Sequence, residues 1–155
     1  MCPNYKAAIY WREYCNVKYS NVDFFGYIDT DNMFNMVNTT NVSNTTTMKS
    51  LTSVALGLLS NLSKNAIADN NHMFATGNSS EVPQESDFIR GMVQCSGDLS
   101  KHSCSGCLDY AMKQLPNNIS EDGDVQLYSL GARTVTGSCN VRYEFYDFNN
   151  TFERY

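Results

Sequence analysis

The sequence predicts an α+β fold in which two helices pack on an antiparallel sheet of about five strands, with disulfides linking the two layers. Two segments have the spacing of an amphipathic helix, and several short segments alternate between apolar and polar residues. Six cysteines occur among the 155 residues, enough for several disulfides. The predicted order is strand, helix, two strands, helix, two strands, which is typical of helices layered on an antiparallel sheet.

The first half of the chain predicts strands, a loop and one helix. Residues 5–28 are rich in aromatic and β-branched residues, which favours strands, and residues 29–32 are turn-like. Residues 33–37 form a short apolar segment, and residues 38–47 are almost wholly Asn, Thr and Ser, which predicts a loop ending in a helix N-cap. A helical apolar face follows at Met48, Leu51, Ala55, Leu58 and Leu62.

The second half predicts strands at residues 72–76, 88–95, 125–128 and 139–148. Between them, Ser100 or Ser103 is expected to cap a second helix that runs to residue 115, just before a proline. In the last strand the alternation points Val141 and Tyr143 to one face and Glu144 to the other.

Composition excludes several classes of function. The 11 basic residues are outnumbered by 16 acidic ones, and the absence of a basic run argues against nucleic acid as a partner. The longest apolar stretch, residues 54–59, is far too short to span a bilayer. The sequence has no phosphate-cradling glycine loop, no G-x-S-x-G elbow and no pair of histidines at metal-ligand spacing, so we expect no catalytic residues, no metal site and no cofactor.

Seven Asn-x-Ser/Thr sequons are candidates for N-glycosylation, and with the cysteines they favour the secretory pathway. They begin at Asn38, Asn41, Asn44, Asn61, Asn78, Asn118 and Asn149. The sequence from Met1 has no signal peptide, so we expect that the N-terminus is missing from this sequence. The alternative is a cytosolic protein whose sequons are never used.

The cysteine-containing motifs carry a resemblance. The segment Cys95-Ser-Gly-Asp-Leu-Ser-Lys-His-Ser-Cys104-Ser-Gly-Cys107 has the spacing C-x8-C-x2-C, and Cys139-Asn-Val-Arg-Tyr-Glu144 follows it. These motifs resemble ginkbilobin-homologous domains, the salt-stress-response/antifungal family of plant cysteine-rich receptor-like kinases and cysteine-rich repeat secretory proteins. The resemblance covers nearly all of residues 31–149 and implies a binding module, not an enzyme.

A partial second copy of the same motif lies at the N-terminus. Cys15-Asn-Val-Lys-Tyr19 repeats Cys139-Asn-Val-Arg-Tyr143. Because these domains commonly occur in tandem, residues 1–30 are interpreted as the C-terminal remnant of a first domain and residues 31–155 as a complete second one. Cys2 and Cys15 either bridge each other or remain free thiols.

The resemblance also implies disulfide pairs. In the family pattern Cys95 pairs with Cys104 and Cys107 with Cys139. The family's third bridge has neither partner here, because its first position falls near Val37 and no cysteine lies between Cys107 and Cys139. Two alternatives stay open for Cys104-Ser-Gly-Cys107: a redox pair, or half of a zinc site completed by Cys95 and Cys139.

Three functions remain: a carbohydrate-binding module with an antifungal or stress-response role, a truncated receptor-kinase ectodomain that acts through protein contacts, and a redox enzyme. The resemblance favours the first, with mannose-type glycans or another ginkbilobin-homologous domain as partner. It implies a location in the apoplast or on the outer side of the plasma membrane.

The resemblance to ginkbilobin implies a mannose-type site at Asn38, Arg133 and Glu144. Sugar hydroxyls can donate to the carboxylate and accept from the guanidinium and the amide. The alternative interpretation is a surface ion pair between Arg133 and Glu144, with Asn38 glycosylated.

Overall fold

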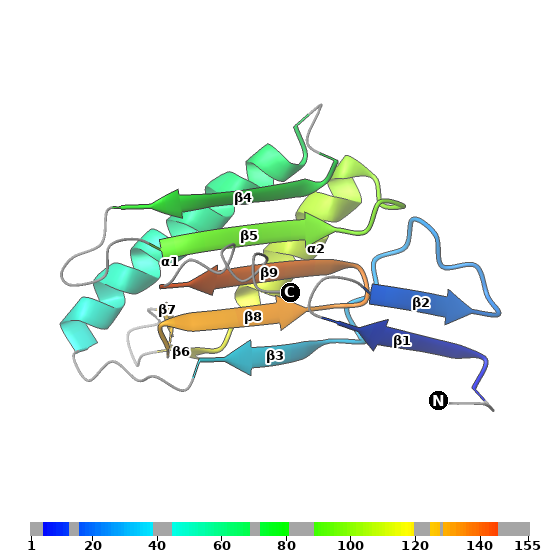
Figure 1. Ribbon diagram of the computed structural model, residues 1–155, viewed down its shortest axis with the longest axis horizontal. Coiled ribbons are helices and arrows are strands. Elements are labelled where there is room, and N and C mark those ends of the chain that lie inside the picture. The colour runs from blue at the N-terminus through cyan, green and yellow to red at the C-terminus, as the bar shows by residue number, and fades with distance from the viewer. Residues whose placement is uncertain are drawn as a thin grey trace, which may run out of the picture.

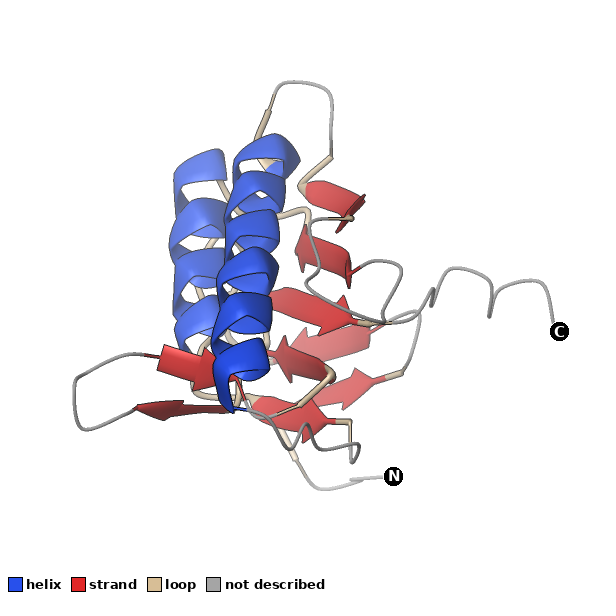
Figure 2. Cartoon of the chain, turned by 90° about the vertical axis from the view of Figure 1, so that its left-hand side faces the viewer, coloured by secondary structure: helices blue, strands red, loops and turns tan. Residues whose placement is uncertain are grey.

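The computed structural model of the chain describes residues 5–12, 16–38, 45–68, 72–80, 89–119, 125–127 and 129–145. Its main body has two layers, because both helices cover the same face of a five-stranded antiparallel sheet (Figure 1, Figure 2). The strands run in the order β3 (Phe34–Val37), β8 (Gly131–Val135), β9 (Cys139–Glu144), β5 (Ile89–Cys95) and β4 (Phe74–Ser79). The predicted α+β fold is confirmed.

The helices are α1 (Thr45–Ala66) and α2 (Lys101–Lys113). Helix α1 begins inside the segment predicted as loop and extends past Leu62. Ser100 is the N-cap of α2, and its hydroxyl accepts a hydrogen bond of 3.0 Å from the backbone N–H of Ser103. This cap satisfies one of the N–H groups that a helix start leaves without a partner.

The core lies between the helices and the sheet. Leu59 of α1, Leu108 of α2, and Val141 and Tyr143 of β9 are each completely buried. Burying one such side chain contributes roughly 1.5–3 kcal/mol to the free energy of unfolding, so these contacts hold the helices against the sheet. The opposite face of β9 carries Arg142 and Glu144, as the alternation of the strand predicts.

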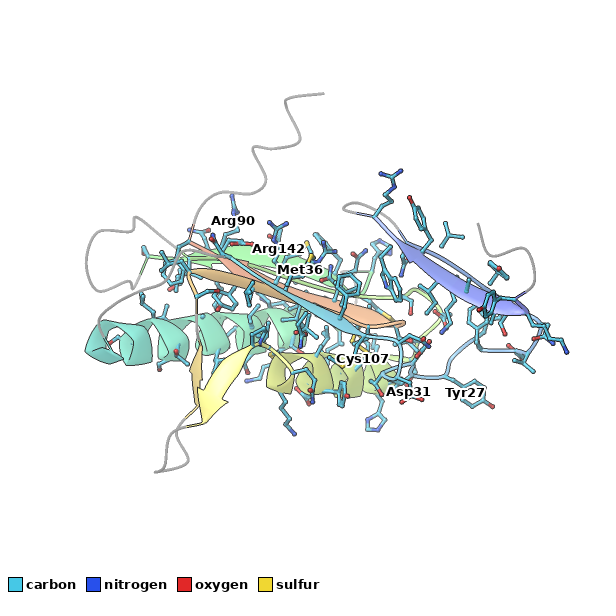
Figure 3. The ribbon with its side chains drawn as sticks, turned by 90° about the horizontal axis from the view of Figure 1, so that it is seen from below. Tyr27, Asp31, Met36, Arg90, Cys107 and Arg142 are labelled. Atoms are coloured by element: carbon cyan, nitrogen blue, oxygen red, sulfur yellow. A yellow bond between two sulfur atoms is a disulfide. The ribbon has the colours of Figure 1, made fainter. Side chains whose placement is uncertain are left out.

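Two disulfides join the layers: Cys95–Cys104 links β5 to α2, and Cys107–Cys139 links α2 to β9. These are the pairs that the family resemblance implies. Cys104 and Cys107 bond to different partners, so the C-x-x-C segment is not a redox pair of its own, and its sulfurs are not thiolate ligands of zinc. Figure 3 shows Cys107 between α2 and the sheet.

One predicted strand belongs to a different sheet, and one strand of the main sheet was not predicted. The segment at residues 125–128 was expected in the main sheet, but β7 (Val125–Leu127) pairs with β6 (Asn117–Ile119) in a separate two-stranded sheet. Strand β8, which was not predicted as a strand, pairs with β9 from Gly131 to Val135.

The N-terminal residues form a hairpin of β1 (Ala7–Trp11) and β2 (Asn16–Ser20), which lies beyond one end of the main sheet (Figure 1). Its register matches that of β8 and β9. Ala8 faces Tyr19 as Ala132 faces Tyr143, which are the positions that the repeated Cys-Asn-Val motif aligns. The interpretation of residues 1–30 as a domain remnant stays a prediction, and Cys2 and Cys15 lie outside the described residues.

Asp29 fastens the hairpin to the main body. Its carboxylate accepts from Lys18 Nζ at 2.7 Å and from Asn32 Nδ2, and its backbone N–H donates to Ser138 Oγ at 2.9 Å. Burial acts to raise the pKa of Asp29, but the hydrogen bonds from Lys18 and Asn32 outweigh it and hold the pKa below its usual value. Asp29 therefore connects β2, through its carboxylate, with the turn between β8 and β9, through its backbone N–H.

Candidate functional site

An open groove of about 800 Å³ lies on the sheet face opposite the helices. Figure 3 shows Met36 and Arg142 on this face, with both helices on the other side of the sheet. Strands β3, β8 and β9 and the end of β1 supply its lining, which includes Trp11, Phe34, Asn38, Arg133, Arg142 and Glu144. All three residues of the predicted mannose-type site therefore line the same groove.

Strand register explains why these side chains meet. Arg133 of β8 lies opposite Arg142 of β9 and Met36 of β3, and Gly131 lies opposite Glu144. Residues opposite each other in neighbouring strands project from the same face of the sheet. Two arginines and a carboxylate are thus brought together from two strands.

Glu144 is buried, with its side chain only 9% exposed. Its Oε1 accepts from Arg142 Nε at 3.1 Å, whereas its Oε2 is buried without a hydrogen-bond partner among the described residues. Burial raises the pKa of Glu144, and the attraction of Arg142 offsets part of that effect. This carboxylate is thus buried and forms an ion pair with Arg142, so it is not the surface group of the alternative interpretation.

Gly131 makes room for this carboxylate. A Cβ atom at position 131 would collide with Oε2 and Cδ of Glu144. The buried position of the carboxylate therefore depends on glycine at the facing position of β8.

The other two predicted residues are held by hydrogen bonds at the same site. Arg133 Nε donates to Asn140 Oδ1 at 2.9 Å, which fixes the direction of the half-buried guanidinium. The backbone N–H of Asn38 donates to the carbonyl of Gly131 at 2.7 Å. Asn38 is therefore tied to the strand that also carries Arg133, even though the family's first cysteine is absent nearby.

Sequence reasoning assigned Asn38, Arg133 and Glu144 to a site and missed the other lining residues, among them Trp11, Arg12, Gly131 and Arg142. The Trp11 ring meets Phe34 edge to face with centroids 5.3 Å apart, and its Nε1 donates to the Thr136 carbonyl at 3.3 Å. Arg142 had a signal, because it lies two residues before Glu144 in the same strand and so on the same face. Nothing in the sequence pairs the N-terminal hairpin with this groove.

The sequons lie in different surroundings. Asn61 and Asn78 are exposed, whereas Asn38 is half-buried in the groove. The candidates Asn41, Asn44 and Asn149 lie outside the described residues, as does the side chain of Asn118 in β6. A glycan on Asn38 would occupy the groove itself.

A family profile described as salt stress response/antifungal matches residues 36–146, well over half of the chain. The chain belongs to this family. The match includes the four disulfide cysteines and the three predicted groove residues Asn38, Arg133 and Glu144.

Members of the salt stress response/antifungal family with similar sequences come from plants. Cysteine-rich repeat secretory protein 38 of Arabidopsis thaliana is 42% identical over 97% of this chain, and an antimicrobial ginkbilobin-2-like protein of Castanea crenata is 45% identical over 95%. These alignments cover 55% and 56% of the relatives, so the chain spans little more than half of their length.

The fold of this family member is also found in a solved structure. The tandem DUF26 ectodomain of the Arabidopsis thaliana cysteine-rich receptor-like protein PDLP8 matches with a TM-score of 0.60 and 22% identity, over 90% of this chain and 57% of that one. At this identity the likeness shows the fold alone. In the described ranges of the present chain, neither helix has the length and apolar content that a bilayer span requires.

Proposed function

We propose that this chain is a secreted binding module that recognises mannose-type saccharides in the groove formed by β3, β8, β9 and the end of β1. The names of its relatives, a secretory protein and an antimicrobial protein, support an extracellular role in defence or stress response. The disulfides support the same compartment, because such bonds persist in oxidising surroundings. None of the polar groups that line the groove requires a cofactor for this role.

The lining has the two kinds of surface that a sugar ring needs. Trp11 and Phe34 offer an apolar wall, and Arg133, Asn38 and Glu144 offer hydrogen-bond donors and acceptors. Binding sites for small molecules commonly combine an apolar wall with a few fixed polar groups in this way. The groove is also already formed, so little ordering of the protein opposes binding.

One observation carries the proposal: Glu144 Oε2 is buried at the groove and has no hydrogen-bond partner among the described residues. A buried acceptor without a partner costs roughly 1–3 kcal/mol, more when it is charged. When the carboxylate turns this oxygen toward the groove, a sugar hydroxyl can donate to it and recover that cost upon binding.

Titration of the full-length, unglycosylated protein with mannose or a mannan fragment tests the proposal. Saturable binding in the millimolar range is expected, and both Arg133→Ala and Glu144→Ala should weaken it by about tenfold or more, because each removes a hydrogen bond to a charged group. Gln94→Ala is the matched control, since Gln94 is exposed on β5 of the same sheet. Absence of saturable binding, or binding that survives both groove substitutions, would reject the site.

A second role, contact with another domain of the same family, is favoured by the exposed face of the hairpin. Val17 and Tyr19 are 59% and 47% exposed, whereas the residues at the matching positions of β9, Val141 and Tyr143, are completely buried. If residues 1–30 are the end of a first domain and residues 31–155 a second, this face is one that a complete first domain would cover.

Limited proteolysis tests this division of the chain. The first cuts are expected before residue 31, leaving a folded remainder, because an isolated two-stranded hairpin is marginally stable in water. Mass spectrometry of the fragments and circular dichroism of the remainder are the measurements. First cuts within residues 48–145 would show that the division is wrong.

A further inference from the structure

The hairpin of β1 and β2 reaches the groove without joining the main sheet. Within the described part of the chain, the two strands pair with each other and form a sheet of their own. The hairpin nevertheless supplies Trp11, whose ring packs edge to face on Phe34 and lines the groove. Contacts outside any shared strand ladder must therefore hold this wall of the groove in place.

One face of the hairpin meets the main body. Ile9 of β1 lies opposite Lys18 of β2, and Trp11 lies two residues beyond Ile9 in the same strand. These side chains therefore project from the same face of the hairpin. They are half-buried, whereas Tyr10 and Tyr19, which project from the other face, are exposed. The face that carries Trp11 is thus the docked one.

Two contacts of this docked face lead to the turn between β8 and β9. Trp11 Nε1 donates to the carbonyl of Thr136 at 3.3 Å. Lys18 Nζ donates to Asp29 Oδ2 at 2.7 Å, and the backbone N–H of Asp29 donates to Ser138 Oγ at 2.9 Å. Asp29 thus links the hairpin to the same turn that receives the Trp11 ring.

Gly137, in the middle of this turn, leaves room for the Asp29 carboxylate. A Cβ atom at position 137 would collide with Oδ2 and Cγ of Asp29. The φ angle of Gly137 is not positive, so the approach of the carboxylate, and not the backbone, is what requires glycine here. The side chains of Lys18 and Asp29 are only 18% and 16% exposed, which distinguishes this pair from a solvated surface ion pair that contributes little.

We propose that Asp29 is a positioning residue of the groove: it clamps β2 to the turn between β8 and β9 and so holds Trp11 against Phe34. Asp29 is not among the lining residues that the structure describes, so it acts through Trp11. The effect on ligand binding rests on the proposed saccharide site. Because only a docked hairpin supplies the Trp11 wall, the apparent affinity for a saccharide falls in proportion to the docked fraction of the molecules.

The fluorescence of Trp11 measures docking directly, because this is the only tryptophan of the chain. In the full-length, unglycosylated protein, Asp29→Asn and Lys18→Met each remove one charge of the clamp. Both are expected to shift the Trp11 emission to longer wavelength and to increase its quenching by acrylamide, because the undocked ring lies in water. Calorimetric titration with methyl α-mannopyranoside should show an affinity that falls several-fold, by the same factor as the docked fraction.

A third variant and a matched control complete the test. Gly137→Ala displaces the Asp29 carboxylate while both charges of the pair remain, and it should change the Trp11 emission in the same direction. Asp31→Asn makes the substitution of the clamp variant at an exposed position of the same segment (Figure 3). It should leave the emission and the affinity unchanged. Far-UV circular dichroism verifies that the main body of each variant is folded.

The outcomes separate this inference from the proposed function. If the clamp variants expose Trp11 but the parent protein binds no saccharide, saccharide binding fails and Asp29 still positions Trp11. Unchanged Trp11 fluorescence in Asp29→Asn and Lys18→Met overturns the positioning role, as does an equal change in Asp31→Asn. Variants that expose Trp11 yet bind methyl α-mannopyranoside as tightly as the parent protein also overturn it, because the hairpin is then not part of the site.

Discussion

Replacing Cys107 and Cys139 together by serine is expected to lower the free energy of unfolding by roughly 3–4 kcal/mol. This disulfide joins residues 32 positions apart and ties helix α2 to the central strand β9. Its loss gives the unfolded chain the conformational freedom of that loop, and it also removes the covalent link between the two layers of the core. Urea-induced unfolding followed by circular dichroism measures the change.

The double-serine variant of Cys95 and Cys104 is the matched control. It introduces the same two hydroxyl groups into the same core, but its loop spans only 9 positions. Chain entropy predicts a smaller loss, about 2.5–3 kcal/mol. An equal or larger loss in this control would show that loop length does not determine the stabilisation, and that local packing around Cys104 does.

Much of the main body was predictable from sequence because its signals are local. Helix α2 has a capping serine at Ser100 and buries Cys104, Cys107 and Ala111 on one face. In strand β9, residues that face the helices alternate with the polar residues Asn140, Arg142 and Glu144 on the other face, and of these six residues only Arg142 is not buried. Where one face of an element is apolar and the other is polar, the period alone identifies the element and its orientation.

Strand β8 was missed because its buried positions mix the apolar residues Ala132 and Val135 with the polar residue Thr134. Thr134 is completely buried and donates from its hydroxyl to Asn35 Oδ1 at 2.8 Å, and Thr136, just after the strand, is 1% exposed. Its groove-facing positions include Gly131, where the Glu144 carboxylate of β9 occupies the space that a side chain would need. When buried side chains of a strand are hydroxyls that form hydrogen bonds, the sequence of that strand is polar on both faces. The alternation of apolar and polar residues that identifies β9 is therefore absent from β8.

The residues of the candidate site also divide into those that the sequence predicts and those that it does not. Arg133 and Glu144 were found because their distances from Cys139 match the family's pattern. Trp11 and Arg12 were not, since they reach the groove from a hairpin more than 100 positions away in sequence from β8. Their position depends on tertiary contacts, the Trp11–Phe34 ring pair and the Asp29 hydrogen bonds, that no local pattern encodes.

Replacing Gly131 by alanine is expected to abolish saccharide binding and to lower the free energy of unfolding by about 1–3 kcal/mol. The new methyl group would occupy the space of the Glu144 carboxylate, which must then move out of its buried position. Loss of the Arg142 hydrogen bond and of the aligned acceptor Oε2 follows. Gly97→Ala is the control, because a Cβ at position 97 would meet no atom within 4 Å.

The pH dependence of this variant distinguishes expulsion of Glu144 from general damage to the sheet. Because burial raises the pKa of Glu144 above its usual value of 4.5, the protonated residue contributes stability at low pH that is lost as pH rises through the raised pKa. In Gly131→Ala the expelled carboxylate returns to solvent, so burial no longer raises its pKa. The stability difference between the parent protein and the variant should therefore be largest below pH 4.5 and decrease toward neutral pH. A difference that stays constant across this range would mean that Glu144 remains buried and that the alanine strains the strand instead.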